Sequence, residues 1–385
     1  MAGLKRSAAV LGIGISDWRA DYQRSRQREK PNDSYGYAAT AFSRALADAG
    51  IERRLIDGLI VGPTVGYERT GEILGIDPRW GGQADAGMAM IQACMAIQCG
   101  LARVVALVYG NDQRTAAVQY GGPEAMGGQN YLSYVYHAPW GLTSQGALYA
   151  LMFHRYCHVH GAPGDGLGPI AVAQRINASR NPEAIMRREI TLADYSAADF
   201  VCEPLRLLDY CLVNDGGVCL IVADPDLASR GSKRPVYVEG VGRADLNHGA
   251  TSLEPRLFDF YLPAQRMAAK QVYEMSGIGP EDVDALQVYD SFSCHILFAL
   301  EGFGFCAPGE GAAFVAQHSL RFDGDLPVNT GGGHLSESYM QGWNHQVEAV
   351  RQLRGEGDAR QVTDCRRVQY ISDVAGKVIS IMYGN

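Results

Sequence analysis

An internal duplication constrains the fold of this chain more than any other feature of its sequence. The stretches AAVLGIGIS at 8–16 and PVYVEGVGRA at 235–244 are both β-type apolar runs that contain Gly-x-Gly. Further on, AGIERRLIDGLIV at 49–61 aligns with SGIGPEDVDALQV at 276–288, and four identities share a displacement of 227 positions. The four pairs are Gly50 and Gly277, Ile51 and Ile278, Asp57 and Asp284, and Val61 and Val288. Each copy predicts a strand, a long helix, a short turn and a buried strand.

The helices and turns of the two copies also correspond. Residues 33–50 and 258–277 carry apolar side chains at three-to-four spacing, which predicts the two long helices. Each copy is followed by a glycine-rich turn that leads into a further helix, at 81–98 and 331–355. Equivalent turns in two equivalent halves would place both helix starts near a shared pseudo-twofold axis.

We therefore predict an α/β protein made of two βαβαβ halves, at 1–234 and 235–385. A segment at about 112–215 interrupts the first half, and we expect it to form a cap that faces the substrate. No linker rich in proline or serine separates the halves, so we expect them to pack as one unit.

Composition excludes several classes of function. The net charge of −8 and the lack of a dense Lys/Arg run argue against nucleic-acid binding. The first apolar stretch is too short to span a membrane and no small-residue cleavage site follows it, so we expect a cytoplasmic protein. Nine cysteines without a CxxC pair are typical of reduced thiols. His154, His158 and His160 have no carboxylate between them, so we expect no metal site.

The stretch VNTGGGHLSESYMQGWNHQ at 328–346 is the strongest candidate for a ligand-binding loop. Glycines let a backbone approach a ligand closely, and free N–H groups at a helix start attract negative charge. No Gly-Lys-Ser/Thr follows the glycines, which disfavours a nucleotide triphosphate. An oxyanion cradle and a tight turn at a helix cap both stay open from the loop alone.

Four segments together resemble the thiolase superfamily, specifically the sterol-carrier-type thiolases and their lipid-transfer-protein relatives. These segments are 137–161, 203–224, LQVYDSFSCH at 286–295 and NTGGGHLSESYMQG at 329–342. The resemblance covers nearly the whole chain. It implies a thiolase-like fold in which the duplicated halves form α/β/α/β/α layers with an inserted cap region, and it implies a homodimer.

The residues that carry out thiolase chemistry are replaced. The resemblance places the nucleophilic cysteine of the family at Ala84, whereas Cys94 and Cys99 fall in the apolar packing pattern of the following helix and are expected in the core. The two family histidines correspond to Tyr289 and Tyr339, and the late Cys-x-Gly signature is missing. Claisen condensation or thiolysis through a covalent thioester is therefore not expected.

Two tyrosines in these places resemble the steroid side-chain aldolases of the superfamily, which cleave β-hydroxyacyl-CoA thioesters by a retro-aldol reaction. The resemblance implies that Tyr289 and Tyr339 are catalytic and that CoA is part of the substrate, with no separate cofactor. The reaction needs two proton-transfer groups and an oxyanion cradle, but no nucleophile. A helix start would favour the phenolate of Tyr339, so we assign Tyr339 as base and Tyr289 as acid, with the reverse order open.

The loop residues complete the candidate site. We expect the glycines to bring backbone donors to the thioester oxygen, His334 to add a hydrogen bond or to cap the turn, and Asp290 to orient a tyrosine or to cap the next helix. The substrate-binding candidates are thus Gly331, Gly332, Gly333, His334 and Asp290. Ser291 has no evident histidine base in the sequence and is not expected to be a nucleophile. Asp209 and Asp215 are expected to be turn formers.

The resemblance also implies partners. The aldolase relatives associate with a small OB-fold and zinc-ribbon protein that helps bind the acyl-CoA, and this chain has no evident basic cluster of its own for the CoA phosphate. For the aldolase interpretation we expect a substrate whose side chain is attached to a ring system through a carbon with a tertiary hydroxyl, and acetyl- or propionyl-CoA as one product. Two alternatives stay open, namely a thiolase with a relocated nucleophile at Cys94, Ser291 or Cys294, and a non-catalytic lipid-transfer or scaffold subunit.

Overall fold

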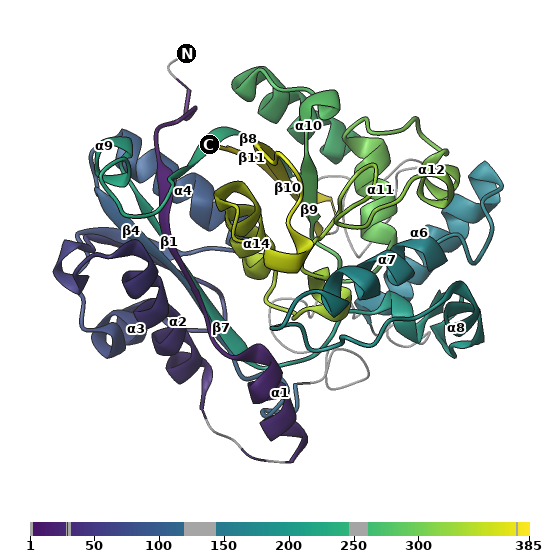
Figure 1. Cartoon of the computed structure of the whole chain (residues 1–385), viewed down its shortest axis with the longest axis horizontal. Helices are drawn as coiled ribbons and strands as arrows, with labels where there is room; N and C mark the ends of the chain where they lie inside the picture. Colours follow the sequence, from purple (N-terminus) through teal and green to yellow (C-terminus); the bar gives the residue numbers. More distant parts are fainter. Residues whose placement is uncertain (1–2, 28, 30–31, 119–143, 246–260, 375) are drawn as a thin grey trace.

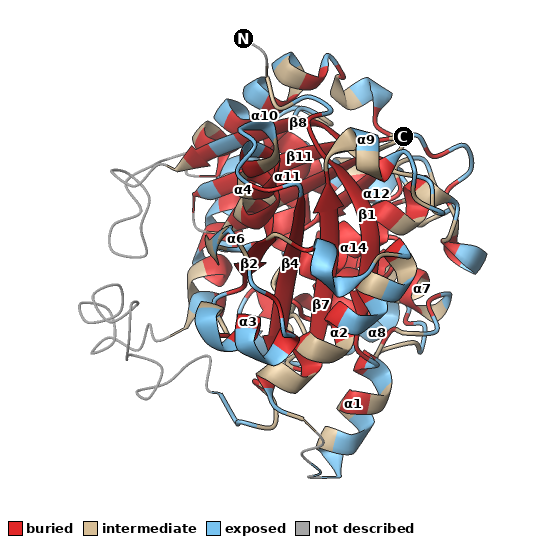
Figure 2. Cartoon of the chain, turned by 90° about the vertical axis from the view of Figure 1, so that its left-hand side faces the viewer, coloured by how far each residue is buried: buried red, intermediate tan, exposed pale blue. Residues whose placement is uncertain are grey.

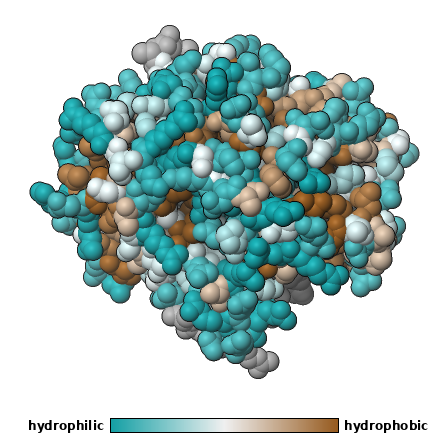
Figure 3. Space-filling model, viewed as in Figure 1, coloured by the Kyte–Doolittle hydropathy of each residue, from teal (hydrophilic) through white to brown (hydrophobic). Residues whose placement is uncertain are grey.

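The computed structural model describes residues 3–27, 29, 32–118, 144–245, 261–374 and 376–385. Nine strands form one mixed sheet in the order β3-β2-β4-β7-β1-β8-β11-β10-β9 (Figure 1). No helix in these ranges is long and apolar enough to cross a membrane. The face shown in Figure 3 is largely hydrophilic, with apolar side chains gathered in smaller areas between the charged ones.

The first half contributes five strands of the sheet and the helices that cover them. Its elements are β1 (Ala9–Ile15), α1 (Trp18–Arg26), α2 (Ser34–Ala49), β2 (Gly58–Val61), α3 (Tyr67–Leu74), β3 (Trp80–Gln83), α4 (Ala86–Gln98), β4 (Val104–Asn111), β7 (Gly216–Ala223) and α9 (Pro225–Ala228). Between β4 and β7 lies the predicted insertion, of which 119–143 falls outside the described residues. Its described elements are α6 (Gln145–His160), α7 (Gly168–Ser179), α8 (Leu192–Ala197), β5 (Phe200–Cys202) and β6 (Leu205–Arg206).

The second half repeats this plan with four strands. Its elements are β8 (Val236–Asp245), α10 (Leu262–Ser276), β9 (Ala285–Val288), α11 (Cys294–Gly302), α12 (Gly311–Gln317), α13 (Gly333–Ser336), α14 (Trp343–Arg354), β10 (Arg367–Val374) and β11 (Lys377–Gly384). Short 3-10 turns occur at Arg53–Leu55, Leu207–Asp209, Pro280–Asp282 and Asp358–Arg360.

The two halves have the same sheet topology from the middle outward. In the first half, β1 is antiparallel to β7, β7 is antiparallel to β4, and β2 is parallel to β4. In the second half, β8, β11, β10 and β9 pair with the same directions. In the second half, a parallel bridge between Leu286 of β9 and Val328 corresponds to the pairing of β2 with β3 in the first half. The duplication seen in the sequence is therefore a duplication of topology.

The elements stack in five layers. Apolar residues of α2 pack on one face of the first-half strands, α4 and α14 share a core with strands of both halves, and α10 and α11 cover the outer face of the second-half strands. Figure 1 shows α14 between the two groups of strands, and Figure 2 shows buried strands under helices with exposed outer faces. The halves join at one edge, where Ala9 and Val10 of β1 pair with Tyr237 and Val236 of β8.

The repeated Gly-x-Gly has a packing role. A Cβ atom at Gly12 or Gly14 would collide with backbone oxygens of α2, and one at Gly240 or Gly242 would collide with backbone oxygens of α10. Only glycine allows each long helix to lie this close to its strand.

The two cysteines expected in the core differ. Cys94 is fully buried within α4, as predicted, but Cys99 is exposed, so that prediction is wrong. Cys99 caps the C-terminal end of α4, where the helix has already left the core.

Candidate active site

A cavity of about 580 Å³ lies between the halves and contains the candidate catalytic residues. Its wall is built from the first residues of α4, the start of α6, the last part of the insertion, the residues after β9, the loop before α14 and one end of β8, β10 and β11. Its apolar lining includes Leu212, Phe292 and Ile379. Such a volume and wall suit a ligand with a bulky apolar part.

Tyr289 and Tyr339 meet in this cavity, with their hydroxyl oxygens 3.1 Å apart. Tyr289 follows β9 directly, and its N–H donates to the carbonyl of Ile371 on β10. The N–H of Tyr339 donates to Oδ1 of Asn214 at 2.8 Å, and Asn214 donates from Nδ2 to Oγ of Ser338. A residue near the end of the insertion therefore fixes the loop that carries Tyr339.

The predicted helix start at Tyr339 is not present. Tyr339 lies between α13 and α14, and α14 begins four residues later at Trp343 with Gly342 as its N-cap, φ = 88°. Tyr339 therefore lies outside the first turn of α14, where the helix dipole acts, and its own N–H is bound to Asn214. Burial raises the pKa of Tyr289 well above 10, while the hydrogen bond with Tyr339 acts in the opposite direction.

The glycine loop encloses internal carboxylates. Gly332 and Gly333 have φ of 109° and 59°, and Gly332 is the N-cap of α13. A Cβ at Gly331 would lie 2.6 Å from the carboxylate of Glu337, and one at Gly333 would collide with that of Asp290. None of the three glycines is among the residues that line the cavity. Of the two readings left open by the sequence, the turn at a helix cap matches this geometry.

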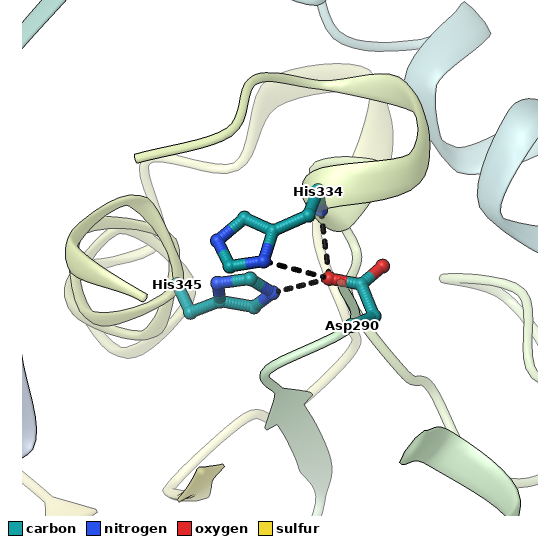
Figure 4. Close-up of side chains that lie close together, drawn as sticks. All are labelled: Asp290, His334 and His345. Carbon is teal, nitrogen blue, oxygen red and sulfur yellow. Dashed lines mark hydrogen bonds and ion pairs between the residues drawn. The ribbon is translucent and has the colours of Figure 1, made fainter. Parts of the chain in front are cut away.

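Asp290 ties this loop together from behind the tyrosines. Its Oδ1 accepts hydrogen bonds from the N–H of His334 at 2.7 Å and from Nε2 of His345 at 3.0 Å (Figure 4), and its Oδ2 accepts one from the N–H of Leu335 at 3.4 Å. The ring of His334 packs edge-on against Tyr289 and also contacts Tyr339, with centroids 4.7 and 4.8 Å away. Asp290 and His334 therefore support the tyrosine pair from outside the cavity.

Asp290, His334 and His345 have ligand atoms within 4.8 Å of one another, which raises the question of a metal site. Nε2 of His334 lies 3.0 Å from the N–H of Gly342 and 3.1 Å from Oδ1 of Asn344, so this nitrogen faces both a donor and an acceptor. Burial lowers the pKa of His334 well below 6.5, which keeps the ring neutral. Hydrogen bonds engage both oxygens of Asp290, Nε2 of His334 and Nε2 of His345, so these three residues form a buried hydrogen-bond network.

Ser291 has a histidine partner that sequence reasoning missed. Its Oγ lies 3.0 Å from Nε2 of His295, one helical turn further along, and Ser291 lines the cavity. The spacing Ser-x-x-x-His at a helix start was the available signal. His295 is buried among the rings of Tyr149, Tyr289 and Phe292, and burial lowers its pKa to about 3.

The described thiols near the site are not activated. Ala84 does not line the cavity, whereas the three residues after it do. Burial raises the pKa of Cys94 and of the cavity-lining Cys211 to about 12, and that of Cys294 well above 9. Because the thiolate is the nucleophile, this setting disfavours a relocated cysteine nucleophile.

Asp209 and Asp215 are more than turn formers, and that prediction is corrected. Asp209 is fully buried and accepts hydrogen bonds from the hydroxyls of Tyr195 and Ser293, which tie the insertion to the start of α11. Oδ1 of Asp215 accepts from the N–H groups of Arg114 and Thr115. Partners this distant along the chain were not visible from local turn chemistry.

Glu337 is expected to make the stability of the chain depend on pH. It is buried, accepts hydrogen bonds from Asn181 at 2.8 Å and Asn344 at 3.0 Å, and its burial next to Glu348 raises its pKa from 4.5 to about 7. The carboxyl of Glu337 binds its proton more tightly in the folded chain than in the unfolded chain. Protonation therefore stabilises the fold fully below pH 4.5, and this stabilisation is lost as the pH rises through 7. The wild type should therefore lose stability between pH 5 and pH 8, whereas Glu337→Gln should not. Over this range the unfolding free energy of the variant, measured relative to that of the wild type, should rise by about 1–3 kcal/mol.

Urea denaturation at a series of pH values would measure this effect. Glu72→Gln, on an exposed side chain, is the control and should show no such trend. A wild type and a Glu337→Gln variant with parallel pH profiles would contradict the raised pKa.

Comparisons with known proteins agree with this geometry. Residues 244–380 match the family described as "Thiolase C-terminal domain-like". The chain is 32% identical to the steroid side-chain-cleaving aldolase of Thermomonospora curvata, over 92% of both chains. It is 32% identical to the 17-hydroxy-3-oxo-4-pregnene-20-carboxyl-CoA lyase of Mycobacterium tuberculosis, over 91% of this chain and 92% of that one.

A solved structure named "Ltp2-ChsH2(DUF35) aldolase" superposes with a TM-score of 0.89 and 29% identity, covering 99% of this chain and 98% of that chain. This similarity confirms the predicted thiolase-like fold. The chain belongs to the thiolase superfamily, in its sterol-carrier and lipid-transfer-protein branch.

Proposed function

We propose that this chain is a carbon-carbon lyase that cleaves a β-hydroxyacyl-CoA by a retro-aldol reaction, giving a ketone and a shorter acyl-CoA. The observation that carries the proposal is the pair of tyrosine hydroxyls 3.1 Å apart in the cavity, at a site whose described thiols are buried and protonated. Two phenols supply proton transfer, and this reaction needs no covalent intermediate.

In the proposed mechanism Tyr339 is the base and Tyr289 is the acid. Burial holds the proton on Tyr289, so its O–H can donate to a phenolate at Tyr339 and stabilise it. The phenolate of Tyr339 takes the proton of the β-hydroxyl, the Cα–Cβ electrons move into the thioester enolate, and the ketone leaves. A proton then passes from the tyrosine pair to the enolate carbon, which restores the starting state.

We propose a steroid or a similar bulky ring with a tertiary hydroxyl as the substrate. The names of the two relatives support this class, and the apolar wall of the cavity suits a ring system. The released thioester would be acetyl- or propionyl-CoA. Gly331, Gly332 and Gly333 would act by shaping the loop that carries Tyr339, because they enclose the carboxylates of Asp290 and Glu337.

We further propose two kinds of protein partner. Strand β3 pairs with β2 on one side and, among the described strands, with none on the other, so this edge would pair with a second copy of the chain in a homodimer. The name of the solved relative includes a DUF35 component, which supports a small OB-fold and zinc-ribbon partner here. That partner would supply part of the site for the acyl-CoA.

Product analysis by mass spectrometry tests the proposal. The chain is incubated with a β-hydroxyacyl-CoA that carries a tertiary ring hydroxyl, with and without the candidate partner and with and without free CoA. A ketone and a shorter acyl-CoA are expected without added CoA. Cleavage that depends on free CoA would indicate a thiolase instead, and no cleavage in any combination would favour the non-catalytic lipid-transfer role.

A further inference from the structure

We propose that Arg243 and Lys377 form an anion-binding subsite at one end of the cavity, where they bind a negatively charged group of the substrate away from the reacting carbon. The inference rests on the proposed retro-aldol function and deepens it. Two parts of the substrate can carry such a charge, namely the phosphates of CoA and a carboxylate on the ring. Both present an oxyanion to the two cations, and the choice of ligands in the experiment separates them.

The register of two strands brings these cations together. Arg243 lies near the end of β8 and pairs with Ile379, while Lys377 begins β11 and pairs with Asp245. Paired residues of antiparallel strands, and every second residue of each strand, point to the same face of a sheet. The four side chains therefore share one face, and all four line the cavity. A basic cluster made in this way is not visible along the sequence.

The same face changes from apolar to charged toward this end. Further inside, Val241 and Ile381 pair with each other and pack in the core shared with α4 and α14. Ile379 follows, and then the face carries Arg243 and Lys377, which are both exposed. An anionic group bound at this end can therefore keep contact with water while an apolar part lies deeper, so its charge need not be buried.

The carboxylates of the cavity wall do not cancel both cations. Oδ2 of Asp245 accepts hydrogen bonds from Nε and Nη2 of Arg243, at 2.9 and 2.5 Å, which orients the guanidinium. Among the residues that the structure describes, Nη1 of Arg243 has no hydrogen-bond partner and Lys377 has no ion-pair partner. Asp85, the other acid of the wall, caps the start of α4 and accepts from the N–H of Met88. This end of the cavity therefore keeps one net positive charge.

The strand register also places the subsite at a distance from the tyrosine pair. Val288, next to Tyr289, pairs with Ile371 of β10. Three residues further along β10, Val374 pairs with Lys377 of β11. At about 3.3 Å per residue and about 4.8 Å between strands, the backbone of Lys377 lies about 10–15 Å from that of Tyr289. The two cations can therefore hold a remote part of the substrate and do not act on the reacting carbon.

Ligand affinities test the proposal. The full chain carrying Tyr339→Phe, which slows turnover, is titrated calorimetrically with four thioesters of one tertiary β-hydroxyacyl group. These are the CoA and the pantetheine thioester, each with a neutral ring and with a ring that carries a carboxylate. The charged group that the subsite binds should improve affinity by about 3- to 10-fold, as expected for a partly exposed ion pair, and this gain should shrink at high salt.

Adding Arg243→Gln and Lys377→Gln should abolish this gain and leave the affinity for the ligand without that charged group unchanged. A gain from the phosphates that depends on the two cations would identify CoA as the source of the anion. A gain from the carboxylate that depends on them would identify the ring. Lys377→Arg keeps the charge and should keep the gain when Arg243 is intact.

Arg69→Gln with Lys270→Gln is the matched control, because it removes the same charge from exposed side chains outside the cavity wall. Gains that persist in the Arg243→Gln and Lys377→Gln variant for both charged groups, or that are lost equally in the control, would overturn the proposal.

These affinities do not depend on cleavage, so the subsite and the lyase reaction fail separately. Charge-dependent binding through the two cations in a chain that cleaves nothing would refute the lyase reaction alone. Cleavage by a chain whose affinities ignore the two cations would refute the subsite alone.

Discussion

Replacing Tyr339 with phenylalanine is expected to lower the rate of cleavage by about 10²- to 10⁴-fold, the usual contribution of a positioned proton-transfer group. The substitution removes one oxygen atom, which lies 3.1 Å from the hydroxyl of Tyr289. The ring contact with His334 and the backbone hydrogen bond to Asn214 stay in place, so the loop keeps its shape. The loss should therefore appear in kcat, with thermal stability close to that of the wild type.

Tyr289→Phe should have an effect of the same order, and the double variant should lose little more than either single variant, since the two hydroxyls act as a unit. Tyr273→Phe is the matched control, because its hydroxyl donates to the carbonyl of Phe303 and does not line the cavity. Full activity in Tyr339→Phe would refute the proposed base. Additive losses in the double variant would show that the tyrosines act in separate steps.

The sequence predicted the tyrosine pair but not its setting. Each tyrosine stands in a motif of the family, and the fold of the second half brings the two motifs together. The local pattern at 331–333 leaves two interpretations open, because a glycine-rich turn before a helix has the same sequence signature whether it faces a ligand or a buried carboxylate. Here the carboxylates come from Asp290, far along the chain, and from Glu337 within the loop.

The other differences between the predictions and the structure come from where three helices begin or end. The start of α14 was placed too early because Gly342, and not Tyr339, adopts the positive φ that caps the helix. The partnership of Ser291 with His295 depends on α11 starting at Cys294, immediately after the strand-end motif. Cys99 was predicted to lie in the core because it continues the apolar pattern of α4. The helix ends one residue earlier, at Gln98, so Cys99 is not on its buried face.

The largest stability effect is expected for Glu348→Ala. Glu348 on α14 is 1% exposed, and both of its oxygens accept hydrogen bonds from the guanidinium of Arg360, at 3.0 and 2.9 Å. Its Oε1 also accepts from the hydroxyl of Thr330 at 2.7 Å, so the helix is tied to the glycine loop. Removing one member of a buried ion pair leaves the other charge without compensation, and we expect a loss of about 3–5 kcal/mol in unfolding free energy.

Chemical denaturation would measure this loss, with Glu72→Ala as the control. Glu72 pairs with Arg69 at 2.6 Å, but both side chains are exposed, so that variant should lose about 1 kcal/mol or less.

A loss in unfolding free energy no larger than that of the control would contradict the prediction. In that case the neighbouring Glu337 would supply the negative charge that balances Arg360. Proximity to Glu348 helps to raise the pKa of Glu337, while Arg360 lowers it. Without Glu348, the carboxyl of Glu337 would therefore ionise more readily and could take over as the counter-charge of Arg360. Adding Glu337→Gln to Glu348→Ala would then restore the full loss, because both buried glutamates that act on the charge of Arg360 would be gone.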